Sequence, residues 1–186
     1  MSGIIIVGAA GSGKDTLAAW ITRDFGATPI GFADPIRAFV QDLLGPGKHR
    51  AAAQAIGDAI RAEDPTAFIR RAQERAAQTP RYLLTDARLP AELAAFPDAL
   101  SIGLVCPTAE RARRLAARDG RAFQPLDHAT ETAVDALIAR CALQIHNDTP
   151  TLATFEQAYT QALKPLLTRH FAYAPTPVSP SPIARR

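Results

Sequence analysis

The sequence predicts an α/β fold in which helices cover both faces of a parallel sheet, and three observations support this. Short apolar runs alternate with helical patterns along the 186-residue chain. Hydrophobic residues make up 47% of the sequence, enough for one sizeable core. The two cysteines form no disulfide framework, and no apolar run approaches transmembrane length. We therefore expect one soluble, cytoplasmic domain with no membrane partner.

Five strands are expected, because five short apolar runs are bounded by turn or loop residues. The first is rich in β-branched residues, which is typical of a buried parallel strand. The expected strands cover residues 3–7, 28–33, 81–86, 100–106 and 143–147.

Helices are expected between these strands. Asp34 and Pro35 would open one helix, because Asp can cap a helix and Pro fits its first position. A second Asp-Pro pair at 64–65 would open another, and Thr108 is the expected N-cap of an arginine-rich helix. The final helix should kink or end near Pro165. The arginine-rich helix would begin at Thr108 and include the run of arginines that follows it. The other expected helices run to about Phe25, then over about 34–44, 48–62, 65–78, 89–96, 130–140 and 151–170.

The segment "GAAGSGK" fits the pattern G-x-x-x-x-G-K of a phosphate-binding loop, or P-loop, between a strand and a helix. Glycines let successive backbone N–H groups turn toward an anion, and the helix N-terminus adds free donors. Lys14 would reach the β- and γ-phosphates of ATP. The residues expected to bind the ATP phosphates are Gly8, Gly11, Ser12, Gly13, Lys14, Asp15 and Thr16.

The loop departs from its usual pattern at Asp15, where a Ser or Thr normally coordinates Mg²⁺. Asp15 could hold Mg²⁺ directly or through water, and Thr16 could contact the α-phosphate. Asp86 closes a predicted strand and would lie beside the loop. It would belong to the Mg²⁺ shell or position the acceptor; alternatively, it caps the segment beginning near Leu89. Arg88 is either a ligand of an acceptor phosphate or a surface arginine.

Four segments, "GSGKDTLA", "GFADPIRAF", "QAIGDAIRAEDPTAFIRRA" and "LLTDARLPAE", occur in the order and approximate spacing of the phage-type deoxynucleoside monophosphate kinases. The later segments "DHATE" and "IHNDTPTLATFEQ" also resemble that family, which is related to phage kinases of 5-hydroxymethyluracil in DNA. The resemblance covers nearly all of residues 3–163. Phe68 stands where many relatives have Trp.

The resemblance implies a P-loop NTPase fold with a five-stranded parallel sheet, a helical acceptor-binding insertion and a lid. Residues 1–171 would form this single kinase domain, and the Pro-rich basic tail 172–186 is expected to be disordered. Within the domain, the expected parts are a core (1–33, 80–107 and 141–171), an insertion (34–79) and a lid region (108–140).

The resemblance also assigns acceptor-binding residues within the insertion. Arg37 and Arg61 would bind an acceptor phosphate, and Arg70 is a weaker candidate; the alternative for each is an exposed helix arginine. Asp34 is either a helix cap or a carboxylate that faces the acceptor. A base is useful only if the acceptor is a hydroxyl, because a phosphate oxygen is already anionic.

Arginines in the predicted lid form a row, since Arg111, Arg114 and Arg118 share one helix face at i, i+3 and i+7. They would stabilise charge on the transferring phosphoryl group, or else form a solvated basic face. His128 and Glu131 would orient the lid or contact a base, the alternative for His128 being a structural cap. The expected catalytic residues are Lys14, Asp34, Asp86, Arg114 and Arg118.

The expected activity is transfer of the γ-phosphoryl group of ATP, with Mg²⁺, to a deoxynucleoside monophosphate. A second hypothesis is phosphorylation of the hydroxymethyl group of 5-hydroxymethyluracil in DNA. A third is a non-catalytic nucleotide-binding protein. The net charge of +3 suits an anionic partner without choosing between a nucleotide and hydroxymethylated DNA. Whether the chain forms a homodimer is left open.

Overall fold

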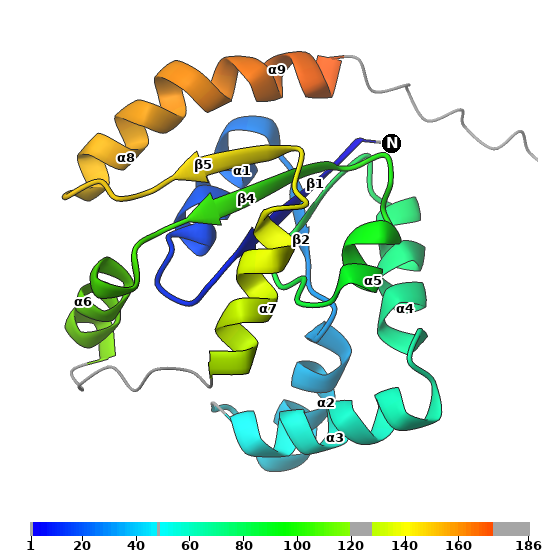
Figure 1. Ribbon diagram of the computed structural model, residues 1–186. Coiled ribbons are helices and arrows are strands. Elements are labelled where there is room, and N and C mark those ends of the chain that lie inside the picture. The colour runs from blue at the N-terminus through cyan, green and yellow to red at the C-terminus, as the bar shows by residue number, and fades with distance from the viewer. Residues whose placement is uncertain (1, 48, 120–127, 173–186) are drawn as a thin grey trace, which may run out of the picture.

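A parallel five-stranded sheet forms the centre of the molecule (Figure 1). The computed structural model describes residues 2–47, 49–119 and 128–172. The strand order over these residues is β2-β3-β1-β4-β5, and every pair is parallel. All five predicted strands are therefore confirmed. Their bounds are β1 Ser2–Gly8, β2 Thr28–Ile30, β3 Arg81–Leu84, β4 Leu100–Val105 and β5 Leu143–His146.

The central position of β1 brings the glycine-rich loop to the middle of the carboxyl edge of the sheet. In the register, Ile5 pairs with Leu84 of β3 and Val7 pairs with Gly103 of β4. The strand β2 is shorter than predicted and ends at Ile30. Beyond it, the N–H of Gly31 donates to Asp34, and those of Phe32 and Ala33 donate to a side chain that follows β3, as described below.

Helices lie between the strands in the predicted order. Each predicted helix is present, with ends shifted by a few residues. Their bounds are α1 Lys14–Phe25, α2 Asp34–Leu44, α3 Arg50–Glu63, α4 Ala67–Ala77, α5 Pro90–Ala94, α6 Thr108–Asp119, α7 His128–Ile138, α8 Leu152–Ala158 and α9 Lys164–Ala172.

The sheet is buried on both faces, because alternate residues of β1 enter two different apolar clusters. Ile4 and Ile6 pack with residues of α1, α8 and α9, including Leu17. Ile5 and Val7 pack with residues of α2, α4 and α7 on the other face. The prediction of helices on both faces is therefore confirmed.

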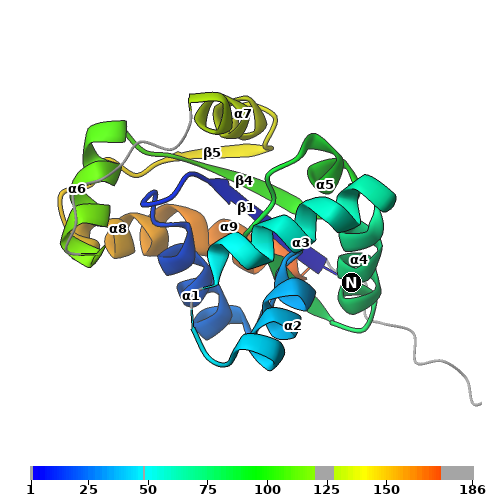
Figure 2. The same cartoon turned by 90° about the horizontal axis from the view of Figure 1, so that it is seen from below.

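The helices α2 and α3 lie on the opposite side of the sheet from α8 and α9 (Figures 1 and 2). Helices α2 and α3 pack closely against each other, because a Cβ placed on Gly57 of α3 would lie 2.9 Å from the Cδ1 of Ile36 in α2. The two helices fall in the segment predicted as the acceptor-binding insertion. The division into core, insertion and lid stays a prediction.

Three predicted helix details differ in the structure. Ala33 is the N-cap of α2, and Asp34 is already helical, so Asp34 is not the cap. Thr108 is likewise the first residue of α6, and its hydroxyl accepts a hydrogen bond from Arg111. The chain also stays helical through Pro165. Its irregularity is a π turn, Tyr159–Leu163, directly before α9.

The π turn and Pro165 are related by backbone hydrogen bonding. The N–H of Lys164 donates to the carbonyl of Tyr159, five residues earlier. Pro165 is the second residue of α9, where its missing N–H is accommodated by the change of hydrogen-bond register. Among the described residues, no helix is both long and apolar enough to cross a bilayer.

Candidate functional site

The glycine-rich loop adopts a conformation that leaves a helix N-terminus available to an anion. Gly11 and Gly13 have φ of 79° and 95°, in the left-handed region that favours glycine. Within the loop, the N–H of Ser12 donates to the carbonyl of Ala9 at 3.2 Å. Gly13 is the N-cap of α1, and no side chain caps this helix. The first amides of α1 can therefore bind a phosphate.

Close contacts leave too little room for a side chain at three glycines of the loop unless the neighbouring atoms shift. A Cβ on Gly8 would lie 2.6 Å from the Ser12 Oγ, and one on Gly11 would lie 2.9 Å from the Arg111 carbonyl oxygen. A Cβ on Gly13 would lie 2.5 Å from the Nδ2 of Asn147. The buried Ser12 hydroxyl has no hydrogen-bond partner among the described residues. Loop shape and donors thus fit the phosphates of ATP.

Lys14 and Asp15 form an ion pair at the start of α1. The Lys14 Nζ lies 3.2 Å from the Asp15 Oδ1, and the Asp15 side chain is 75% exposed. Within the described ranges, no cluster of three or more His, Cys, Asp or Glu residues could hold a metal. Mg²⁺ bound with nucleotide phosphates needs only one or two carboxylates, so Asp15 fits this role. The roles of Asp15 and the half-buried Thr16 stay predictions.

Asp86 follows β3 and ties that strand to the loop before α2. Its carboxylate accepts hydrogen bonds from the N–H of Phe32 at 3.0 Å and of Ala33 at 3.3 Å. It also forms an ion pair with Arg37 at 3.1 Å. The alternative in which Asp86 caps the segment near Leu89 is wrong, because its oxygens face the β2–α2 loop. The predicted roles of Asp86 toward Mg²⁺ and the acceptor are not tested by this geometry.

Asp34 is the centre of a second set of charged contacts. Its carboxylate accepts from the N–H of Gly31 at 2.8 Å, pairs with Arg37 at 2.9 Å and pairs with Arg75 at 2.6 Å. Burial alone would raise the pKa of Asp34, but the hydrogen bonds from Arg37, Arg75 and Gly31 outweigh it and lower the pKa. Asp34, Arg37 and Asp86 are therefore brought together as one cluster.

Sequence reasoning missed Arg75. A signal was present in its spacing, because Phe68, Ala72 and Arg75 occur at i, i+4 and i+7 and share one face of α4. Phe68 and Ala72 are buried, which places Arg75 at the edge of the face that packs on the molecule.

The other predicted acceptor arginines have separate partners. Arg61 lies 3.3 Å from Asp58, and its guanidinium stands over the ring of Phe68 at 5.0 Å from the centroid. Arg70 pairs with Asp64 at 3.0 Å. Neither arginine joins the cluster of Asp34, Arg37 and Asp86 through a hydrogen bond or ion pair given by the structure. Their predicted role in acceptor binding stays a prediction.

Glu92 is a buried carboxylate that fixes the segment after Asp86. It is 3% exposed and accepts hydrogen bonds from the N–H of Arg88 at 2.7 Å and of Leu89 at 3.0 Å. Burial raises the pKa of Glu92. The Arg88 side chain is exposed and has no hydrogen bond or ion pair to the described residues. A Glu three residues after the N-cap was the signal for this contact.

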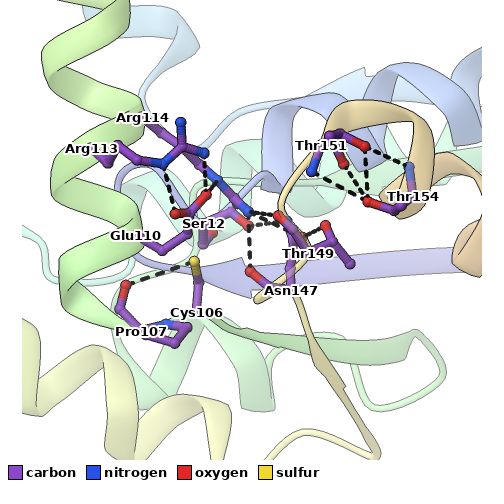
Figure 3. Close-up of polar contacts among 10 residues, drawn as sticks. All are labelled: Ser12, Cys106, Pro107, Glu110, Arg113, Arg114, Asn147, Thr149, Thr151 and Thr154. Carbon is purple, nitrogen blue, oxygen red and sulfur yellow. Dashed lines mark hydrogen bonds and ion pairs between the residues drawn. The ribbon is translucent and has the colours of Figure 1, made fainter.

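The predicted lid arginines turn toward different partners. Arg114 donates to Glu110 at 2.7 Å and to the Thr149 carbonyl at 3.0 Å (Figure 3). Hydrogen bonds from Arg113 and Arg114 lower the pKa of Glu110 to about 2. Arg111 is buried, whereas Arg118 is exposed. The catalytic role of Arg114 and Arg118 stays a prediction.

Some predicted features lie outside the described residues. The backbone of α7 begins at His128, but the side chains of His128 and Glu131 are not described. The same holds for residues 120–127 of the predicted lid and for 173–186 of the predicted tail.

The fold is shared with several solved structures, among them a shikimate kinase and a gluconokinase. The protein TT1252 from Thermus thermophilus is 22% identical with a TM-score of 0.57, over 90% of this chain and 96% of that one. A shikimate kinase from Bacteroides thetaiotaomicron is 15% identical with a TM-score of 0.56, over 90% of this chain and 98% of that one. A gluconokinase from Sinorhizobium meliloti is 13% identical with a TM-score of 0.53, over 92% of this chain and 97% of that one.

These similarities establish the fold of the chain. It is a P-loop NTPase fold of the kind found in shikimate kinases, as predicted. No family model and no curated protein sequence matches the chain. Membership of the phage-type deoxynucleoside monophosphate kinases stays a prediction.

Proposed function

We propose that the chain is an ATP-dependent kinase whose acceptor is a deoxynucleoside monophosphate. The observation that carries the proposal is the placement of two groups at one sheet edge. The glycine-rich loop and Lys14 follow the central strand β1, while Asp86 and Arg88 follow its neighbour β3. A phosphoryl donor and an acceptor held at these two strand ends would lie side by side. The shikimate kinase and gluconokinase folds support a phosphotransferase.

On the donor side, the loop amides and Lys14 would hold the ATP phosphates. Mg²⁺, held by Asp15 and the phosphates, would supply positive charge where negative charge develops in the transition state. An oxygen of the acceptor phosphate forms a bond to the γ-phosphorus as the bond to the β,γ-bridging oxygen breaks, and ADP leaves. No proton needs to move, because the acceptor oxygen is already anionic.

On the acceptor side, Arg88 supports an anionic group. Its side chain follows Asp86 by two residues and makes no ion pair with the described residues. Burial alone would lower the pKa of Arg37, but its contacts with Asp34 and Asp86 raise it, so Arg37 stays charged. An acceptor phosphate would compete with these two carboxylates for the guanidinium of Arg37.

The same cluster supports the second candidate, a kinase of 5-hydroxymethyluracil in DNA. Arg37 is already neutralised by Asp34 and Asp86, and the Asp34 side chain is 37% exposed. In this reaction the hydroxymethyl oxygen bonds to the γ-phosphorus, the bond to ADP breaks, and the proton passes to the Asp34 carboxylate. The lowered pKa of Asp34 makes it a weak base, which favours the phosphate acceptor.

The experiment is to measure ADP release with ATP, Mg²⁺ and two sets of acceptors. One set contains free deoxynucleoside monophosphates, including hydroxymethylated pyrimidines; the other contains duplex DNA with and without 5-hydroxymethyluracil. We expect turnover with a free monophosphate, and loss of at least about 100-fold in Lys14→Ala. Arg169→Ala, an exposed change in α9, is the matched control.

Two outcomes separate the candidates. Turnover only with modified DNA would overturn the first candidate and support the second; Asp34→Asn should then abolish kcat with little change in KM. Absence of turnover with every acceptor, in a chain that binds ATP, would favour a nucleotide-binding protein over both kinases.

A further inference from the structure

Asn147 lies at the point where the phosphate-binding loop meets the segment after β5. It is 1% exposed, and its side-chain amide both donates and accepts hydrogen bonds. The Nδ2 donates to the carbonyl of Ser12 at 2.8 Å, and the Oδ1 accepts from the hydroxyl of Thr149 at 2.8 Å (Figure 3). The amide is therefore fixed in one orientation between the two segments.

The contact with the Ser12 carbonyl bears on how the loop presents its donors. In a trans peptide, the carbonyl and the following N–H point in opposite directions. Every described peptide of the chain is trans. Because Asn147 holds the Ser12 carbonyl on the outer side of the loop, the N–H of Gly13 points to the inner side, where a phosphate would bind.

Gly13 also packs directly against the amide of Asn147. A Cβ on Gly13 would lie 2.5 Å from the Asn147 Nδ2, and the left-handed φ of Gly13 depends on the same peptide orientation. The G-x-x-x-x-G-K motif identifies Gly13, but it says nothing of the side chain behind it, which comes 134 positions later in the chain.

Arg114 connects this contact to helix α6. Its guanidinium donates to the Asn147 carbonyl at 3.3 Å, to the Asn147 Oδ1 at 3.4 Å and to the Thr149 carbonyl at 3.0 Å. The Glu110 carboxylate holds the same guanidinium from one helical turn away at 2.7 Å. A displacement of α6 would therefore act on Asn147, and through it on the loop.

We propose that Asn147 is a positioning residue that holds the glycine-rich loop in its phosphate-binding shape, and that Arg114 couples helix α6 to the loop through Asn147. This inference rests on the proposed ATP site. It is independent of the acceptor, because every contact that carries it lies on the β4–β5 side of the loop, away from the cluster of Asp34, Arg37 and Asp86.

The first test is Asn147→Asp, which keeps size and shape. The carboxylate can still accept from Thr149 and Arg114, but it presents an oxygen to the Ser12 carbonyl in place of a donor. Calorimetry with ATP and Mg²⁺, without any acceptor, should show a Kd raised about tenfold or more. In turnover, KM for ATP should rise more than kcat falls. Equal ATP affinity in wild type and Asn147→Asp would overturn the proposal.

The control separates loop positioning from stability. Thr151→Ala removes the N-cap of α8, where the Thr151 hydroxyl accepts from the N–H of Thr154 at 3.2 Å. This change should lower the midpoint of thermal unfolding and leave the Kd for ATP unchanged. If Asn147→Asp fails to fold, Thr149→Val takes its place. It removes the hydroxyl that orients the Asn147 amide, and it should raise the Kd about threefold.

A double-mutant cycle tests the coupling. Arg114→Met and Asn147→Asp should together weaken ATP binding by less than the product of their separate effects, because both act on the same loop contact. Additive effects would overturn the role of Arg114. A wild-type chain that does not bind ATP would overturn the proposed function and this inference together. ATP binding that is tight in the wild type and equally tight in Asn147→Asp, or in Thr149→Val where that variant takes its place, would overturn the inference alone.

Discussion

The guanidinium of Arg75 lies 2.6 Å from the carboxylate of Asp34, so helix α4 is tied to the first residue of helix α2. Arg37 holds the other oxygen of the same carboxylate and reaches Asp86 after β3. Two arginines and two aspartates thus join the predicted acceptor-binding insertion to the sheet. Their formal charges cancel, so the cluster can hold its shape before any acceptor arrives.

Arg75→Met should impair use of the acceptor without weakening ATP binding. Loss of Arg75 leaves Asp34 and Arg37 less well positioned, and small displacements near a reacting group are costly. We expect kcat/KM for the acceptor to fall about tenfold and the Kd for ATP to stay unchanged. Arg71→Met is the control, because Arg71 is exposed on the same helix and its ion pair within the described part of the chain is with the neighbouring Glu74. Unchanged acceptor kinetics in Arg75→Met would contradict this role.

Glu92→Gln should stabilise the protein increasingly as pH rises. Burial raises the pKa of Glu92, so its contribution to stability is greatest below 4.5, the usual glutamate value, and is lost as pH rises through the folded pKa. Glutamine keeps an oxygen for the N–H groups of Arg88 and Leu89 and carries no charge. The free energy of unfolding, measured in urea from pH 5 to pH 8, should increasingly favour the variant over wild type.

The matching variant Glu92→Ala removes the cap of α5 altogether. It should be about 1 kcal/mol less stable than wild type at pH 5. A Glu92→Gln variant that loses stability in parallel with Glu92→Ala would show that the negative charge itself is needed.

Asp24→Asn should lower stability at neutral pH. The Asp24 carboxylate in α1 accepts from Arg23, from Lys164 and from the Tyr159 hydroxyl, and its side chain is 9% exposed. The hydrogen bond from Arg23 is the main reason that the pKa of Asp24 is lowered. We expect a loss of about 1–2 kcal/mol in the free energy of unfolding at pH 7.

The pH dependence of this effect has a defined sign. A depressed pKa gives stability that is present above 3.8, the usual aspartate value, and that is lost as pH falls toward the folded value. The difference between wild type and Asp24→Asn in urea unfolding should therefore shrink between pH 4 and pH 2. A difference that is constant with pH would contradict this account.

Asp15→Asn should change the Mg²⁺ dependence of ATP binding. If Asp15 holds the ion, the Mg²⁺ concentration for half-maximal ATP binding rises about tenfold. Without Mg²⁺, the variant should bind ATP at least as tightly as wild type, because a carboxylate near the phosphates and its pair with Lys14 are removed. Asp98→Asn, an exposed change before β4 at the opposite sheet edge, should alter neither quantity.

The sequence was sufficient to predict the sheet and the donor loop. Each buried parallel strand is a short apolar run, and the loop's glycines, its lysine and the flanking strand are close together in the chain. Such local patterns depend on few distant contacts. Only the ends of the elements differ from the prediction. One example is β2, beyond which the Asp86 carboxylate accepts hydrogen bonds from the N–H groups of Phe32 and Ala33.

The partners of the site residues were harder to predict, because they are far apart in sequence. Arg75 and Asp34 are 41 positions apart, and Asn147 and Ser12 are 135 apart. Helical spacing indicates which face a residue occupies, but it does not indicate which of several carboxylates or carbonyls it will meet. Arg114 was placed on the correct helix, yet spacing could not show that it turns toward the segment at 147–149.

The π turn at Tyr159–Leu163 acts as a phase correction for the C-terminal helices. The residues that face the sheet here recur every fourth position, and they are Phe155, Tyr159, Leu163, Leu167 and Phe171. In a regular α-helix this stripe would rotate by about 160° from first to last, whereas one extra residue in a wide turn reduces the rotation to roughly 60°. A regular α-helix of the same length would swing Leu167 and Phe171 away from the sheet, whereas deleting one residue of the turn should restore a regular helix and leave both residues facing the sheet.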